Sequence, residues 1–277
     1  MLSTDSLYSP LDFWGGIMRV IFMALCSTLI FANALYAEKH TYLFKEDLVL
    51  LEEGDSSVPY SPCSTFKIPL SLIGLDAGIL KDAKTPQWKF KEKYLDGFTF
   101  ILDRWRQDHN PSMWLKNSCV WYSQKLTKKL GEESFQFYVS RLNYGNEDLS
   151  GDQEKNNGLT HCWLSSSLKI SVSDQVNFLE DLYNEGLALS DFSQKVTKEM
   201  LFLEPLNEEW DLYGKTGGGH LLDEDGYHEM GWFVGWAQNK NRHIIFAYHI
   251  KDEEKQLSYP SIRAKEAVKA CLLDLIH

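Results

Sequence analysis

The first clear pattern of hydrophobic and polar positions along the chain consists of two short apolar runs separated by a polar turn. The runs at 41–44 and 48–51 precede Gly54 and predict a β-hairpin. Segment 64–80 follows and is apolar on nearly every side of a helical projection. A helix of that kind is buried on all sides, so the pattern predicts a central helix. Segment 82–117 is rich in Trp, Asp, Lys and Pro and predicts loops and short helices.

The middle of the chain is predominantly helical by its periodicity. Segments 118–130 and 133–142 predict two helices, and the polar, Gly- and Asn-rich stretch 143–162 predicts a long loop. Long ordered loops often carry function. Segment 173–183 is amphipathic, and Ser173 is the residue expected to cap this helix.

The pattern changes after residue 210. Segments 212–216, 230–237 and 243–250 predict three strands, and segment 261–276 predicts a closing amphipathic helix. Two early strands, a helical middle, three late strands and a final helix are typical of an α+β fold. We expect one antiparallel sheet of five to seven strands, flanked by helices, which the chain leaves to build a helical lobe and then rejoins.

The N-terminus has the features of a secretory signal peptide. Arg19 precedes an apolar run at 20–31, and small residues follow it. The run is shorter than the ~20 residues of a membrane-spanning helix. We therefore expect a signal peptide at 1–37, a single domain at 38–277 and a periplasmic location after cleavage. If Met18 is the start, the residues before it are an N-terminal extension; a buried or anchoring N-terminal helix is the alternative.

Composition and charge exclude several functions. The chain is 44% hydrophobic and 24% charged, and its net charge of −11 disfavours binding to nucleic acid. None of the five cysteines forms a CxxC pair, and the histidines lack ligand spacing, so neither a metal site nor a dense disulfide framework is predicted. The sequence is compatible both with a disulfide bond and with free cysteines. No glycine loop precedes a helix, so no nucleotide cofactor is expected.

The first candidate for chemistry is an S-x-x-K tetrad formed by Ser64 and Lys67. Residues three apart lie on one helix face, so the hydroxyl and the amine can meet. A serine hydroxyl needs a base to become a nucleophile, and Lys67 can be that base only where burial lowers its pKa. Such a tetrad also arises by chance, and a second one at 166–169 is interpreted as a polar helix face.

The second candidate is a Lys-Thr-Gly sequence in a predicted strand. Lys215 and Thr216 can bind a carboxylate by charge and hydrogen bond, and Gly217 allows a substrate to approach closely. The backbone N–H groups of Ser64 and Gly218 suit an oxyanion hole. Taken alone, the sequence is also compatible with a solvated turn.

Two shorter motifs complete a constellation. Ser-Cys-Val occupies 118–120, where the alternative interpretation of the serine is a helix N-cap. Tyr-Gly-Asn occupies 144–146, where the alternative is an ordinary turn. The order STFK, SxV, YGN, KTG resembles the class D (oxacillin-hydrolysing) serine β-lactamases, a penicillin-recognising, transpeptidase-like fold. The resemblance runs from Cys63 to the C-terminal helix.

This resemblance implies specific roles. Ser64 would be acylated by a β-lactam, and Lys67 would be carbamylated by CO₂ from bicarbonate and act as general base. Trp163 would hold the carbamate, Ser118 would relay a proton, and Val120 would cover the carbamate. No metal or other cofactor is implied.

The resemblance also implies how the substrate carboxylate is bound. Lys215 and Thr216 would bind this carboxylate, and Gly217 and Gly218 would belong to the same substrate-binding strand. Many relatives add an arginine shortly before the last helix. Here Ser261 and Arg263 are both candidates, and the register leaves the choice open.

Three other functions are compatible with parts of this pattern. A penicillin sensor or a penicillin-binding protein would be acylated without turnover, and a structural domain would not react. Sensors usually carry several membrane helices, and cell-wall enzymes carry further domains. We therefore expect a secreted hydrolase of small-molecule β-lactams, as a monomer or weak dimer without stable membrane association.

Overall fold

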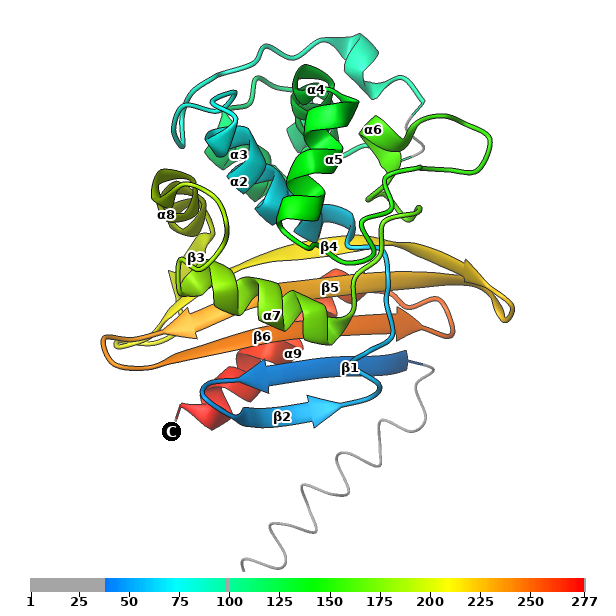
Figure 1. The fold of residues 1–277 in the computed structure, drawn as a ribbon. Coiled ribbons are helices and arrows are strands. Elements are labelled where there is room, and N and C mark those ends of the chain that lie inside the picture. The colour runs from blue at the N-terminus through cyan, green and yellow to red at the C-terminus, as the bar shows by residue number, and fades with distance from the viewer. Residues whose placement is uncertain (1–37, 98–99, 277) are drawn as a thin grey trace, which may run out of the picture. The chain divides into compact units, whose positions relative to one another are not determined.

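The computed structural model describes residues 38–97 and 100–276. The predicted signal peptide and extension at 1–37 lie outside this described part. The domain is built on a six-stranded sheet with the order β2-β1-β6-β5-β4-β3 (Figure 1). Its strands are β1 (Glu38–Lys45), β2 (Val49–Glu53), β3 (Phe202–Pro205), β4 (Asp211–Asp223), β5 (Gly226–Gln238) and β6 (His243–Asp252). The predicted α+β fold with one antiparallel sheet is confirmed.

The chain leaves the sheet after β2 and returns to it at β3. Between them lie η2 (Cys63–Phe66), α2 (Lys67–Asp76), η3 (Glu92–Leu95), η4 (Asp103–Trp105), α3 (Pro111–Asn117), α4 (Val120–Leu130), α5 (Glu132–Arg141), α6 (Gly158–His161), α7 (Val172–Tyr183) and α8 (Asp191–Met200). The last helix, α9 (Pro260–Leu275), packs on the other side of the sheet from α7 (Figure 1). The predicted excursion into a helical lobe is therefore present.

The central strands of the sheet are buried on both faces, which explains why residues 230–237 of β5 are apolar almost without interruption. Trp232, Val234 and Trp236 belong to a large core shared with the helical lobe. Phe233 and Ala237 belong to a second core shared with α9. Side chains alternate along a strand, so both residue parities must be apolar when helices cover both faces.

The central helix is shorter than the predicted 64–80. The first residues form the 3₁₀ turn η2, and α2 begins at Lys67. At the other end Gly78 adopts a φ of +66°, and the Ile79 N–H bonds the Gly74 carbonyl at 2.9 Å. This is the Schellman arrangement, which ends a helix at a left-handed residue. The nucleophile candidate Ser64 therefore lies in a tight turn at the foot of the helix.

Two helix caps differ from the prediction. The N-cap of α7 is Ser171, whose hydroxyl accepts from the Asp174 N–H, so the prediction of Ser173 was wrong. Ser118 does not begin a helix either: it is the left-handed C-cap of α3, and α4 begins at Val120. Both errors arise because a serine near a helix start fits several cap positions.

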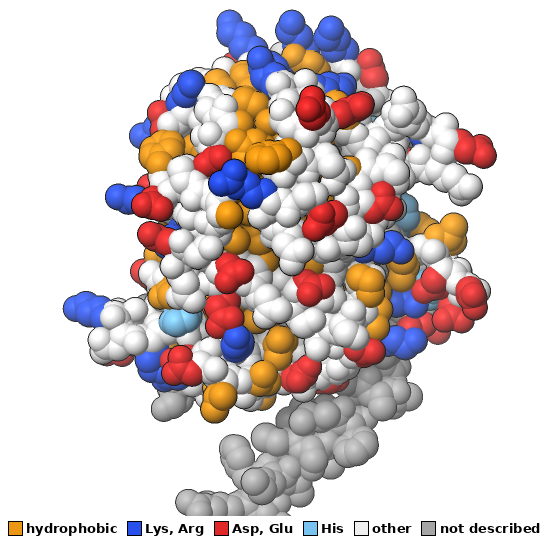
Figure 2. Space-filling view, in the orientation of Figure 1, with side chains coloured by type: hydrophobic (Ala, Val, Ile, Leu, Met, Phe, Trp, Pro, Cys, Tyr) orange, Lys and Arg blue, Asp and Glu red, His pale blue; other side chains and the backbone are white. Residues whose placement is uncertain are grey.

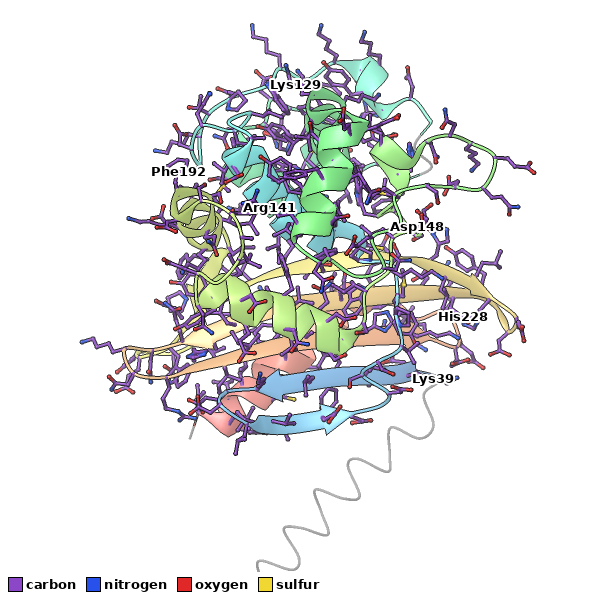
Figure 3. All side chains as sticks on the ribbon, in the orientation of Figure 1. Lys39, Lys129, Arg141, Asp148, Phe192 and His228 are labelled. Carbon is purple, nitrogen blue, oxygen red and sulfur yellow. The ribbon has the colours of Figure 1, made fainter. Side chains whose placement is uncertain are left out.

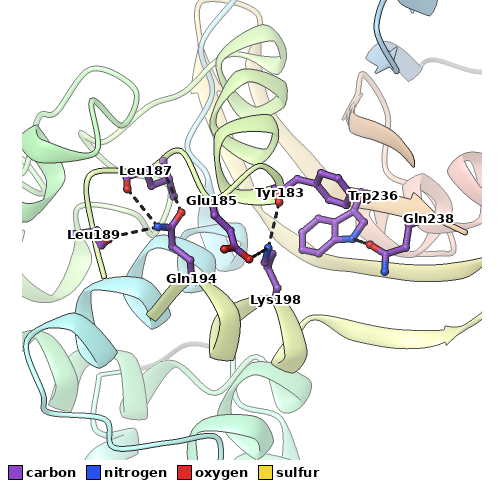
Figure 4. Close-up of polar contacts among 8 residues, drawn as sticks. All are labelled: Tyr183, Glu185, Leu187, Leu189, Gln194, Lys198, Trp236 and Gln238. Atoms are coloured by element: carbon purple, nitrogen blue, oxygen red, sulfur yellow. Dashed lines mark hydrogen bonds and ion pairs between the residues drawn. The ribbon is translucent and has the colours of Figure 1, made fainter. Parts of the chain in front are cut away.

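Helix α8 and strand β3 were not predicted. The inward face of α8 is largely polar, with Ser193, Gln194 and Thr197 buried, so it lacks an apolar stripe. Its side chains instead bind backbone, as Figure 4 shows for Gln194 on the Leu187 and Leu189 carbonyls at 3.3 and 3.2 Å. Val196 is the one apolar side chain of α8 that is buried in the core, so hydrogen bonds of this kind add to a small apolar contact.

Charges are distributed unevenly over the face shown in Figure 2. Lys and Arg side chains gather at the end of the helical lobe where Lys129 lies, and acidic side chains are spread over the remainder (Figures 2 and 3). Within the described residues, no helix has both the length and the apolarity that crossing a membrane requires. The four cysteines of this part of the chain are free thiols.

Candidate active site

Ser64 and Lys67 meet at the junction of η2 and α2. The Lys67 Nζ lies 3.1 Å from the Ser64 Oγ and donates a hydrogen bond to it. The Lys67 side chain has no exposed surface. Burial penalises its charged form and lowers its pKa from 10.5 to about 8. The amine is therefore much closer to neutrality at physiological pH than an ordinary lysine.

Trp163 packs against the residue that precedes Lys67. Its ring stacks on Phe66 with 5.5 Å between centroids, and its carbonyl accepts from the Ser61 hydroxyl at 2.9 Å. The Trp163 Nε1 is buried and has no hydrogen-bond partner among the described residues. A buried N–H without an acceptor is costly and uncommon, so this donor is suited to a group that the protein chain does not itself supply.

Ser118 occupies a left-handed turn between α3 and α4, with a φ of +51°. Its hydroxyl accepts a hydrogen bond from the Lys215 Nζ, which also donates to the Thr216 carbonyl at 2.8 Å. Non-glycine residues in this conformation cost about 1 kcal/mol and are common at functional sites. Val120 follows as the first residue of α4, with 6% of its surface exposed.

Lys215 is a buried cation on β4. Its pKa lies well below the usual value, first because of burial and then because Lys67 and Arg104 carry like charge nearby. No carboxylate of residues 38–97 or 100–276 forms an ion pair with it. An anionic ligand would stabilise its charged form, so Lys215 is chemically suited to bind a carboxylate.

The glycines after Lys215 let β4 approach η2. A Cβ on Gly217 would lie 2.8 Å from the Pro62 carbonyl oxygen and 3.0 Å from the Thr65 nitrogen. A side chain at this position would displace the backbone of either β4 or η2, so only glycine fits. The strand edge that carries Gly217 and Gly218 therefore borders the turn that carries Ser64.

The structure distinguishes between the two carboxylate candidates on α9. The Ser261 Oγ lies 3.4 Å from a Cβ built on Gly218, so this hydroxyl is beside the K-T-G strand. Arg263 instead donates to the Asp252 carboxylate and the Ser258 carbonyl. Of these two candidates, the structure brings Ser261 and not Arg263 to the site.

The Tyr-Gly-Asn motif organises the long loop. Tyr144 is buried and its ring centroid lies 5.4 Å from that of Phe66. The Asn146 side chain accepts from the Lys169 N–H at 2.9 Å and donates to the Ser167 carbonyl at 3.0 Å. The second S-x-x-K tetrad, at 166–169, lies in this turn region, so the prediction of a polar helix face was wrong. The loop also includes Asp148, labelled in Figure 3.

Arg104 is the neighbour of Lys215 that the sequence did not single out. It lies in η4, and its Nε donates to the carbonyl of Asn117 at 3.1 Å. Asn117 is the residue directly before Ser118. Segment 82–117 shows no motif. The only signal in the sequence was a charged residue in a tryptophan-rich loop, which is also the pattern of an ordinary solvated surface.

Comparisons with known proteins agree with this geometry. Residues 34–273 match the family Transpeptidase, the penicillin binding protein transpeptidase domain. The chain is 40% identical over 202 residues to β-lactamase OXA-9 of Klebsiella pneumoniae, covering 72% of this chain and 73% of the relative. It is 38% identical over 221 residues to β-lactamase OXA-1 of Escherichia coli, covering 79% and 77%.

A solved structure shows the same architecture. The class D β-lactamase OXA-427 superposes with a TM-score of 0.78 at 38% identity, covering 86% of this chain and 98% of that one. Fold and site thus define a penicillin-recognising serine enzyme of the transpeptidase type. Within it, the chain belongs to the class D serine β-lactamases.

Proposed function

We propose that this protein hydrolyses the β-lactam ring of penicillin-type antibiotics through an acyl-enzyme on Ser64, and thereby confers resistance. The observation that carries the proposal is the 3.1 Å contact between the Ser64 Oγ and the Lys67 Nζ. A hydroxyl beside a buried amine of lowered pKa is the arrangement that activates a serine nucleophile.

The active form of Lys67 is proposed to be its carbamate, made from CO₂ or bicarbonate. The residues fit this group, because the amine is buried with a pKa of about 8 and the Trp163 Nε1 has no acceptor among the described residues. When present, the carbamate would supply an anionic oxygen as general base for acylation and deacylation. Trp163 would hold it by the indole N–H, and Val120 would limit the access of water.

The remaining residues position the substrate and move a proton. Ser118 relays a proton towards the leaving nitrogen, and the supporting observation is that its hydroxyl accepts a hydrogen bond from the Lys215 Nζ. Lys215 and Thr216, together with Ser261, bind the substrate carboxylate. The backbone N–H groups of Ser64 and Gly218 stabilise the oxyanion.

Turnover tests the proposal against the sensor and penicillin-binding alternatives. Purified protein is mixed with a chromogenic β-lactam, with and without added bicarbonate, beside a Ser64→Ala control. Sustained turnover that bicarbonate increases, absent from Ser64→Ala, is expected. A single stoichiometric burst, with the acylated mass persisting for hours, would show a sensor or binding protein instead.

Localisation and assembly follow from the same proposal. The protein would act in the periplasm after removal of 1–37, as a monomer or weak dimer, with no nucleic-acid partner because its net charge is −11. N-terminal mass analysis of the exported protein and light scattering test these statements. An uncleaved, membrane-retained chain would contradict the first, and a stable higher oligomer the second.

A further inference from the structure

Segment 100–105, which carries Arg104, lies at the rim of the site. It contacts two parts of the site, the turn before Ser118 and the start of α9. On one side, the Arg104 Nε and the Trp105 Nε1 both donate to the Asn117 carbonyl, at 3.1 and 3.0 Å. Asn117 directly precedes Ser118, whose hydroxyl bonds Lys215. The guanidinium is thus anchored one residue away from the proton-relay serine.

The other side of this segment reaches the N-terminus of α9. The Phe100 ring contacts Tyr259 edge-to-face, with 6.2 Å between centroids, and contacts Trp105 at 6.5 Å. Tyr259 is the N-cap of α9 and stands two residues before Ser261. Segment 100–105 therefore spans from the Ser118 turn to the end of α9 that carries the Ser261 hydroxyl.

Arg104 has unused binding capacity. Its side chain is exposed, and apart from the Nε bond it makes no hydrogen bond or ion pair to any residue that the structure describes. Both terminal nitrogens are consequently available to a ligand, in the fork geometry that matches a carboxylate. By contrast, Arg106 is paired with Glu92, and Arg263 with Asp252.

The charge of Arg104 acts on the K-T-G lysine. Its positive charge contributes to lowering the pKa of Lys215, as does that of Lys67. The two cations have no carboxylate partner among residues 38–97 and 100–276, and they repel each other in the free protein. An anion bound between them removes that repulsion, which makes the site more favourable for an anionic substrate than Lys215 would be alone.

We propose that Arg104 is a substrate-binding residue whose guanidinium supplies the second positive charge for the carboxylate of the bound β-lactam, a position for which Arg263 is not available. This inference rests on the proposed function. It assigns carboxylate binding to a residue of the helical lobe, in addition to the sheet and α9. The rim of the site would thereby select anionic substrates and attract them before they reach Ser64.

The test separates binding from positioning by comparing Arg104→Gln with Arg106→Gln, an exposed neighbour outside the site. For a β-lactam carrying its ring carboxylate, Arg104→Gln should raise KM roughly fivefold to tenfold, with kcat within about twofold. The fall of kcat/KM with added NaCl should also be weaker than in the wild type. Arg104→Lys should recover part of the loss, and Arg106→Gln should behave as the wild type.

Two results would overturn the inference. An unchanged KM in Arg104→Gln would show that the guanidinium does not bind substrate, and a loss confined to kcat would show that it only positions Ser118 through Asn117. If the wild type is acylated without turnover, the same comparison is made on the acylation rate at varied substrate concentration. Failure of hydrolysis is thus distinguished from failure of the Arg104 inference.

Discussion

The ammonium of Lys215 donates a hydrogen bond to the hydroxyl of Ser118, and this contact joins β4 to the turn between α3 and α4. The two residues are 97 positions apart in the chain. Sheet and helical lobe thus each contribute one half of a polar pair beside the nucleophile. The catalytic geometry depends on how these two parts of the domain pack together.

Replacing Ser118 by alanine should lower kcat by about 10²- to 10⁴-fold, the range typical of a lost proton-transfer group. The thermal midpoint should stay close to that of the wild type, because the main chain of the turn is unchanged. Steady-state kinetics and a thermal melt check both statements. Ser166→Ala, in the second S-x-x-K tetrad, is the matched control and should remain within about twofold of the wild type.

Trp163→Phe keeps the ring that stacks on Phe66 and removes the indole N–H. If that N–H holds a carbamate on Lys67, the bicarbonate concentration for half-maximal activity should rise about tenfold. Activity is titrated with bicarbonate for wild type and variant. Trp236→Phe is the control, because that indole donates to the Gln238 Oε1 at 3.1 Å (Figure 4). Identical bicarbonate curves for Trp163→Phe and wild type would argue against the assignment.

The pH dependence of reactivation should follow the neutral amine of Lys67. Burial lowers the pKa of Lys67 from 10.5 to about 8, so the amine is mostly charged below that pH and mostly neutral above it. After decarbamylation at low pH, the rate of recovery at fixed dissolved CO₂ should rise about tenfold per pH unit and level off above about 8. A rate that keeps rising towards pH 10 would indicate an ordinary, unperturbed lysine.

Lys67→Met should abolish turnover and stabilise the fold in bicarbonate-free buffer. The folded-state pKa of about 8 lies below the unfolded value, so the wild type binds fewer protons when folded between about 8 and 10.5. Its free energy of unfolding should therefore increase as the pH rises through that window. Below pH 8 the buried ammonium costs up to about 3 kcal/mol, at 1.36 kcal/mol per pKa unit.

Urea unfolding at pH 7 and pH 9.5 measures this effect. The variant should gain stability mainly at pH 7 and show a flatter pH dependence than the wild type. Equal stability of the two proteins at pH 7 would mean that the fold tolerates the charged amine without cost. A gain in stability together with a loss of activity is typical of residues retained for function.

The local sequence pattern was sufficient to predict most of the regular helices and strands and to identify the motifs in their order. The hairpin, the three late strands and two helices follow from the spacing of apolar residues. The helices predicted at 118–130 and 133–142 lie at 120–130 and 132–141 in the structure. The tetrad spacing was also enough to place Ser64 and Lys67 together, since neighbours three apart in a helical turn always meet.

The tertiary structure decided what depends on distant partners. Helix α8 was missed because most of its buried side chains are polar, and Gln194 among them bonds to neighbouring backbone. The choice between Ser261 and Arg263 depended on Asp252, which binds the arginine from another element. Arg104 lies near Lys215 only because the lobe folds over β4. Sequence spacing determines contacts within an element, whereas contacts between elements are fixed by the packing of the whole domain.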